Sequence, residues 1–192
     1  MRKMHRSFYP FIMATVVLTA FMALILLTVP SDAKVFSTKD DALKRAFPDA
    51  VMIERKTLFL SKEDVRRIEG LSGRRVDSRL FTYYEAVGPD GTSGYAVIQG
   101  HVVRTKSMVY MAVISPAGEI DHIDILAFHE PEEYMPSRRW LDQFRGRRLS
   151  ERLRINSEIQ AITGASLSSY AITGEARKAL AILELKVLGA AE

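Results

Sequence analysis

Cysteine is absent from the 192 residues of this chain. Disulfide bonds, iron–sulfur clusters, thiolate zinc sites and covalently attached c-type haem are therefore all excluded. A lipid-anchored lipoprotein is excluded as well, since no cysteine can take the lipid. Histidine is scarce too, and its four copies have no ligand spacing. The sequence therefore predicts no metal site.

A strong charge of either sign is also missing. The formal net charge of +4 is too small to indicate nucleic-acid binding by itself. Low-complexity segments are lacking, and the 26% charged and 47% apolar residues are typical of a folded protein. No Ser-His-Asp arrangement is supported by the spacings, so hydrolysis is not predicted.

The N-terminus has the pattern of a targeting segment. Arg2, Lys3 and Arg6 precede an uncharged apolar run over residues 11–29, and Ser31 and Ala33 then form a small-x-small exit before Lys34. This is the pattern of a secretory signal peptide. At about 1.5 Å per residue the run also spans about 28 Å, enough for a transmembrane anchor. Residues 1–33 are thus predicted to be a signal peptide or an anchor, with residues 34–192 exported to the periplasm or the outer face of the cytoplasmic membrane.

The exported part reads as an α+β domain, an antiparallel β-sheet with flanking helices. Helices are expected over 41–47, 61–71 with Ser61 as N-cap, and 137–144, and strands over 51–60, 80–87, 94–103, 107–114 and 120–128. Short connections favour an antiparallel meander. In the last strand, Ile123, Ile125 and Ala127 are expected on one face. A long helix over about 168–188 carries an apolar stripe of Ile172, Ala176, Ala179, Leu183 and Val187.

The segment that carries chemistry lies before this last helix. It reads Gln160-Ala-Ile-Thr-Gly-Ala-Ser-Leu-Ser-Ser169, a small-residue turn followed by a helix start rich in hydroxyl groups. Gly164 and Ala165 allow another group close to the backbone. The free amides of the first helical turn are suited to a phosphate. The alternative is an ordinary helix start in which Ser166 or Ser168 is the N-cap.

The same segment resembles the flavinylation motif of FMN-binding domains. That family includes the FMN-bearing subunits of the sodium-translocating NADH:quinone reductase and of Rnf complexes, and small exported proteins. The family pattern is Asp-x-x-Ser/Thr-Gly-Ala-Thr/Ser-x-x-Ser/Thr, and Thr163, Gly164, Ala165, Ser166 and Ser169 match it. Gln160 stands where the family has Asp. The resemblance covers about residues 94–180, including Phe128-His-Glu-Pro131 and Trp140-Leu-Asp-Gln-Phe-Arg-Gly146.

The resemblance implies an exported electron-transfer flavoprotein in a membrane-associated or extracytoplasmic redox chain. A flavin transferase would attach FMN through its phosphate to Ser166. The cofactor-binding residues that it implies are Thr163, Gly164, Ala165, Leu167, Ser168 and Ser169, with His129 and Glu130 as candidates near the flavin. A hydrogen-bonded strand end is the alternative for the last two. The rival functions are an exported adaptor of the same fold without flavin and a substrate-reducing enzyme; an electron carrier is favoured over a stand-alone enzyme.

Charge is segregated along the second half of the chain. Six acidic residues between 119 and 133 have no Lys or Arg among them, and seven arginines follow between 138 and 154. Solvated faces are the usual explanation. The functional alternatives are a docking surface for an acidic redox partner or contact with anionic lipid, whereas export argues against nucleic acid. The tyrosines at 83, 84, 95 and 110 and Trp140 are expected to pack in the sheet and core.

Overall fold

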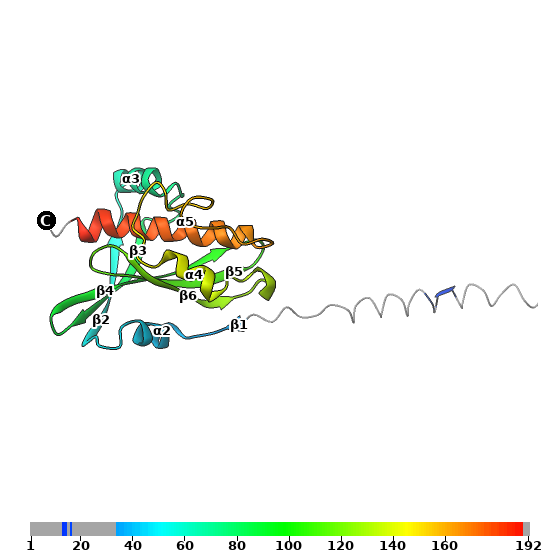
Figure 1. Ribbon diagram of the computed structural model, residues 1–192, viewed down its shortest axis with the longest axis horizontal. Coiled ribbons are helices and arrows are strands. Elements are labelled where there is room, and N and C mark those ends of the chain that lie inside the picture. The colour runs from blue at the N-terminus through cyan, green and yellow to red at the C-terminus, as the bar shows by residue number, and fades with distance from the viewer. Residues whose placement is uncertain (1–12, 15, 17–33, 190–192) are drawn as a thin grey trace, which may run out of the picture. The chain divides into compact units, whose positions relative to one another are not determined.

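The computed structural model describes residues 13, 14, 16 and 34–189 (Figure 1). The predicted signal or anchor, residues 1–33, thus lies outside the described residues except at three positions. Within the described part of the chain, no helix is both long and apolar enough to span a membrane.

One six-stranded antiparallel sheet forms the centre of the domain, in the order β1-β6-β5-β4-β3-β2. Its strands are β1 (Lys34–Val35), β2 (Met52–Phe59), β3 (Leu80–Gly88), β4 (Gly91–Val102), β5 (Ser107–Ile114) and β6 (Ile120–Phe128). From β2 to β6 each strand pairs with the next, because the connections are short enough for antiparallel neighbours. The predicted α+β class and the meander are confirmed.

The helices are α2 (Lys39–Ala46), α3 (Lys62–Ser72), α4 (Arg138–Leu141) and α5 (Ser166–Leu183). There are also two short 3₁₀ helices, η1 (Glu132–Tyr134) and η2 (Asp142–Phe144), and a π-helix, η3 (Glu184–Leu188), which continues α5. Ser61 caps α3 as predicted. Its hydroxyl accepts from the Asp64 amide at 3.0 Å, and the Asp64 carboxylate accepts from the Ser61 amide at 2.8 Å, which is a capping box.

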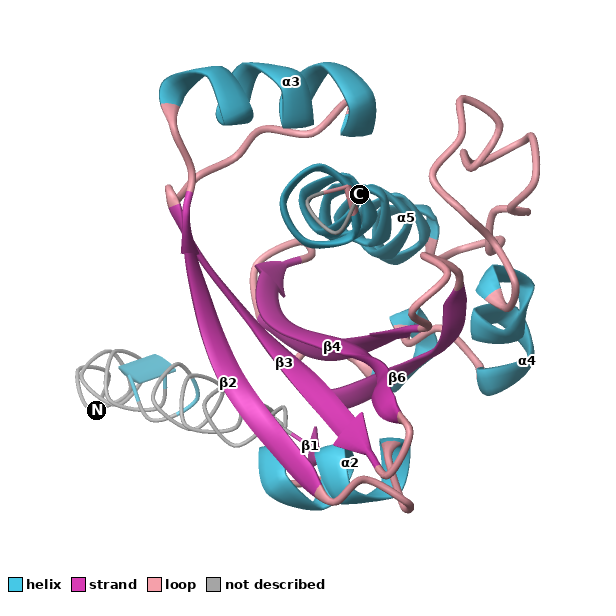
Figure 2. Cartoon of the chain, turned by 90° about the vertical axis from the view of Figure 1, so that its left-hand side faces the viewer, coloured by secondary structure: helices cyan, strands magenta, loops and turns pink. Residues whose placement is uncertain are grey.

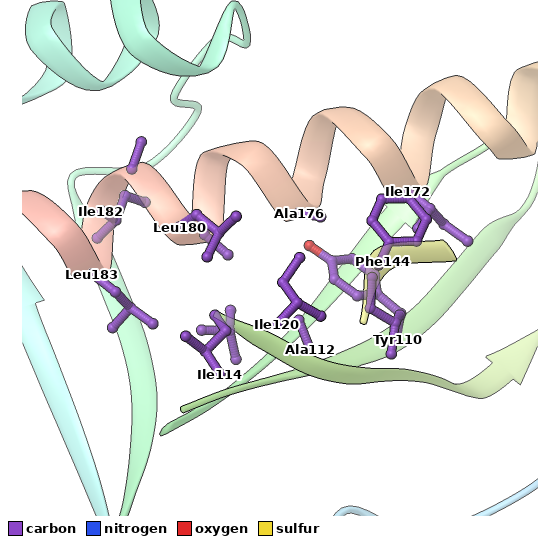
Figure 3. Close-up of a cluster of buried hydrophobic side chains, with 14 of the residues drawn as sticks. Tyr110, Ala112, Ile114, Ile120, Phe144, Ile172, Ala176, Leu180, Ile182 and Leu183 are labelled. Atoms are coloured by element: carbon purple, nitrogen blue, oxygen red, sulfur yellow. The ribbon is translucent and has the colours of Figure 1, made fainter. Parts of the chain in front are cut away.

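Helices cover both faces of the sheet. Helix α2 lies on one face, while α5 crosses the other and is enclosed by α3 and by the loop beside α4 (Figure 2). The larger core joins the sheet to α5. In Figure 3, Ile172, Ala176, Leu180 and Leu183 of α5 lie over Tyr110, Ala112, Ile114, Ile120 and Phe144. The smaller core lies under α2 and contains Leu43, Phe47, Tyr84, Met111 and Leu126.

Two expectations about packing are confirmed, and one is wrong. Tyr83, Tyr84, Tyr95 and Tyr110 are all buried in the two cores, and Trp140 packs edge-on against Phe144 with ring centroids 5.4 Å apart. Ala127, however, does not share a face with Ile123 and Ile125. It pairs with Val109, which packs in the smaller core, while Ile125 pairs with Tyr110 of the larger core. A β-bulge at Leu126 inserts one residue and inverts the alternation there.

Candidate functional site: the start of helix α5

The turn before α5 is held by a buried serine. The Ser169 hydroxyl donates to the Ala165 carbonyl at 3.1 Å and accepts from the Ile162 amide at 3.1 Å. The Ala165 amide closes the turn by donating to the Ile162 carbonyl at 3.1 Å. Gly164 has a left-handed φ of 83°, a conformation that a glycine adopts without steric cost. Ser169 therefore fixes the turn that precedes Ser166.

A second buried serine ties this turn to the rest of the domain. The Ser168 hydroxyl donates to the Tyr134 carbonyl at 2.6 Å, and the guanidinium of Arg104 lies 4.8 Å from the centre of the Tyr134 ring. The turn is also fixed from its other end, since the Trp140 indole N–H donates to the Gln160 carbonyl at 2.6 Å. The start of α5 is thus built on elements that are distant in sequence.

Ser166 is different from its two neighbours. It is the first residue of α5 and is exposed, and its hydroxyl has no hydrogen-bond partner among residues 34–189. The interpretation of Ser166 or Ser168 as the N-cap is wrong, because Ala165 holds the N-cap position and no side chain caps the helix. The predicted helix start at 168 was two residues late for the same reason: no capping side chain marks it.

The first amides of α5 are also available. The first backbone bond into the helix runs from the Ser169 amide to the Ala165 carbonyl at 3.2 Å. In the described part of the chain, the amides of Ser166, Leu167 and Ser168 have no acceptor. Such amides at the positive end of a helix dipole stabilise a negatively charged group. An exposed hydroxyl, three free amides and an uncapped helix therefore meet at Ser166.

The structure brings the predicted motif residues together, but some are exposed and others are buried. Thr163, Gly164, Ser166 and Leu167 are exposed around the turn, while Ala165, Ser168 and Ser169 are buried within it. Nothing within 4 Å would meet a Cβ added at Gly164, so the space beside it is open. Sequence reasoning did not separate the serines that support the turn from the serine that is free to react.

Glu130 holds the turn between β4 and β5. Its carboxylate accepts from the amides of Thr105 at 2.7 Å, Lys106 at 2.8 Å and Arg104 at 3.2 Å. His129 is half-buried, and its Nδ1 lies 2.8 Å from the Ser107 carbonyl. The hydrogen-bonded strand end is therefore observed for both residues. Glu130 is linked to the start of α5 through Arg104 and Tyr134, and its cofactor role, like that of His129, stays a prediction.

These bonds predict a pH-dependent stability. The Thr105 amide, aided by those of Lys106 and Arg104, lowers the pKa of Glu130 against the opposing effect of burial. Because the folded pKa is below the unfolded value of about 4.3, the stabilisation is present above that value and is lost as pH falls through the folded pKa. Glu130→Gln should lower the free energy of unfolding at neutral pH by about 1–2 kcal/mol, and the difference in stability from wild type should become smaller in acid. Urea unfolding at several pH values measures this difference. A difference that does not change with pH would contradict the stabilising role of the ionised Glu130 carboxylate.

The two charged runs of the sequence meet in the fold. Arg148 lies 2.9 Å from Glu119 and Arg145 lies 3.4 Å from Asp121, while Arg147 lies 3.7 Å from Glu158, which is outside the acidic run. These side chains are mostly exposed, so each pair adds little stability. The pairing nevertheless places a basic side chain beside an acidic one at each of these three positions. The arrangement favours solvated, paired faces over a uniformly basic docking surface.

A pocket of about 300 Å³ lies further along α5, which sequence reasoning missed. Its lining includes Tyr170, Thr173, Gly174 and Arg177 of α5, together with Arg74 and Arg154. Thr173 and Arg177 are buried although they are polar. The only available signal was the group of charged residues at 175, 177 and 178 inside an otherwise apolar helix.

Comparisons with known proteins leave the family open. No protein-family model matches the chain, and no curated protein matches it. Among residues 13, 14, 16 and 34–189, no cluster of three His, Asp or Glu side chains is placed to hold a metal ion.

Proposed function

We propose that this domain is an exported electron carrier with FMN esterified through its phosphate to the Ser166 hydroxyl. The single observation that carries the proposal is the state of Ser166. It is exposed at the first position of α5, its hydroxyl is unpaired within the described residues, and it follows a turn that Ser168 and Ser169 hold from inside. This geometry accompanies the motif by which the segment resembles the FMN-binding domains.

The residues around Ser166 fit a phosphoester. The space beside Gly164 is open, so a bulky group can approach the hydroxyl. The amides of Ser166, Leu167 and Ser168 can donate to phosphate oxygens, and the dipole of the 18-residue α5 favours a negative charge there. FMN would supply the redox chemistry of its ring. The protein would fix the phosphate and orient the group, with a flavin transferase needed for attachment.

Covalent attachment suits the proposed location. A protein exported to the periplasm or to the outer face of the cytoplasmic membrane has no ready supply of free cofactor. A tethered flavin also cannot be lost during exchange with a membrane or extracytoplasmic redox partner. The N-terminal pattern of residues 1–33 supports this location.

The second candidate function is an exported adaptor module of the same fold without flavin. The observation that favours it is Gln160, which stands where the resembling family has Asp. The Gln160 amide donates to the Gln143 side chain at 2.9 Å, and its carbonyl accepts from Trp140. Its side chain is exposed and has no hydrogen-bond partner in the described chain. The backbone of this position is thus structural, while the side chain is free to vary.

The two candidate functions predict different visible absorption of the protein after denaturation. The electron carrier, produced together with a flavin transferase, should keep visible flavin absorption on the polypeptide in denaturant. The adaptor should be colourless under the same conditions. Absorption of the denatured, desalted protein therefore distinguishes them.

Gln160→Asp should raise the fraction of chains that carry FMN, if the carboxylate assists attachment. The substitution leaves the two backbone hydrogen bonds in place, so folding stability should change by less than about 0.5 kcal/mol. Gln160→Asn is the matched control, because it shortens the side chain equally without adding charge. The ratio of flavin absorption to protein measures the effect. Equal loading of both variants would show that this position does not control attachment.

A further inference from the structure

Four residues of α5 form one stripe that starts at the proposed attachment site. At about 100° per residue, Ser166, Tyr170, Thr173 and Arg177 fall on the same side of the helix. Ile172 and Ala176, which pack on the sheet (Figure 3), lie about 80–120° away from Ser166 around the helix. The pocket of about 300 Å³ opens along this stripe, with Tyr170 half-exposed at the end nearer Ser166.

A buried hydroxyl in this pocket has no partner. Thr173 is only 4% exposed, and its Oγ1 forms no hydrogen bond within the described residues. Burying an unpaired hydroxyl costs about 1–3 kcal/mol, so such groups are uncommon in folded proteins. In this conformation Oγ1 is closed off from solvent, so a ligand in the pocket that accepts a hydrogen bond would remove this cost only after the Thr173 side chain turns toward the pocket.

A buried cation in the pocket lacks a counter-ion. Arg177 is 3% exposed and donates only to backbone carbonyls, those of Leu71 at 2.6 Å, Ser72 at 2.8 Å, Leu153 at 3.3 Å and Ser150. No carboxylate of the described chain lies within ion-pair distance of it. Burial, and next the charge of Arg154, lower the pKa of Arg177. The positive charge is held there at a cost that an electron-rich ligand would reduce.

Two further arginines complete the wall. A Cβ at Gly174 would lie 2.6 Å from the Cδ atom of Arg74, so glycine lets this side chain lie against α5. Arg74 pairs with Glu175 at 3.4 Å, and Arg154 pairs with Glu151 at 2.7 Å. The pocket thus combines a tyrosine ring, an unpaired hydroxyl donor and a positive field.

We propose that this pocket binds the isoalloxazine ring of the FMN attached at Ser166. The inference rests on the proposed function. Tyr170 to Gly174 lie about 6–12 Å along the helix from Ser166, a distance that a ribityl chain and a three-ring system cover together. The exposed Tyr170 packs against the ring, and Thr173, with its side chain turned toward the pocket, donates to one of the ring's carbonyl or nitrogen acceptors. The arginine charges favour the electron-rich reduced ring and raise its reduction potential.

Riboflavin tests the pocket without the tether. It carries the ring and the ribityl chain but no phosphate, so its binding to the full chain produced without flavin transferase does not depend on Ser166. Its fluorescence should be quenched saturably. Tyr170→Leu should weaken binding about tenfold, the effect of an aromatic contact of about 1.4 kcal/mol. Thr173→Val should weaken it too while leaving the apoprotein at least as stable, which separates ligand binding from folding.

The flavin-loaded protein supplies the second measurement. Arg154→Gln should lower the midpoint potential of the flavin. The matched control is Arg152→Gln, an exposed arginine of the same loop outside the pocket lining, which should leave the potential unchanged. If FMN attaches but its fluorescence and potential ignore every pocket substitution, the ring site is wrong and the proposed function stands. If no FMN attaches but riboflavin binds as described, the tether is wrong and the pocket stands. Failure of both measurements would overturn both.

Discussion

Arg177→Leu should lower the free energy of unfolding by about 3 kcal/mol or more, a large effect for one substitution. The guanidinium joins α5 to the end of α3 and to the loop before Ile155 through four carbonyl groups. Leucine fills part of the volume but leaves these acceptors without donors, and each buried unpaired acceptor costs about 1–3 kcal/mol. Removal of the buried charge offsets part of this loss.

The control for this prediction is Arg154→Leu. Arg154 belongs to the same region but is half-exposed, and its one ion pair among residues 34–189 is with the exposed Glu151, so its loss should cost less than about 1 kcal/mol. Urea unfolding of both variants measures the difference. Equal stabilities would mean that Arg177 does not hold α3, α5 and the loop together.

Ser166→Ala should abolish flavin that survives denaturation, while the stability of the apoprotein changes by less than about 0.5 kcal/mol. The small structural effect is expected because Ser166 is exposed and does not cap α5. Ser166→Thr should retain attachment, since threonine keeps the hydroxyl. Absorption after denaturation and urea unfolding measure the two effects.

Ser168→Ala gives the opposite pattern and serves as the matched control. It removes the bond to the Tyr134 carbonyl and should cost about 1 kcal/mol of stability, yet the attachment hydroxyl remains. A loss of flavin from Ser168→Ala with none from Ser166→Ala would show that the motif is out of register.

The sheet could be predicted from sequence because its signals are local. Period-two apolar patterns, short turns and the Ser61 cap gave most strands and helices within a few residues. Two details depend on distant partners and were missed. The two-residue β1 exists only through pairing with β6, and the bulge at Leu126 is visible only in the register between β5 and β6.

Helix α5 shows a different limit. Its stripe of Ile172, Ala176, Ala179 and Leu183 predicted one buried side, yet the opposite side is also covered, by α3 and the loop before Ile155. Sequence periodicity reports which side is most apolar, not what later covers the other side. The burial of Glu175, Arg177 and Lys178, and with it the pocket, therefore could not be predicted.

The motif at Ser166 shows both what a pattern gives and what it omits. It located the turn and the helix start, but three serines at 166, 168 and 169 look equivalent in sequence. Only the contacts separate them, since the hydroxyls of Ser168 and Ser169 are bonded to backbone carbonyls inside the domain. Likewise, the segregated charges of residues 119–154 left open solvated faces or a docking surface, and it is their pairing in space that favours solvated faces.

The central claim, an FMN phosphoester on Ser166, is tested most directly by the intact mass of the protein produced with a flavin transferase, followed by mapping of the modified peptide. The claim predicts a mass increased by one FMN less one water, with the adduct on Ser166. An unmodified mass under these conditions would contradict it and favour the adaptor function, and an adduct on the buried Ser168 or Ser169 would contradict the assignment of the reactive hydroxyl.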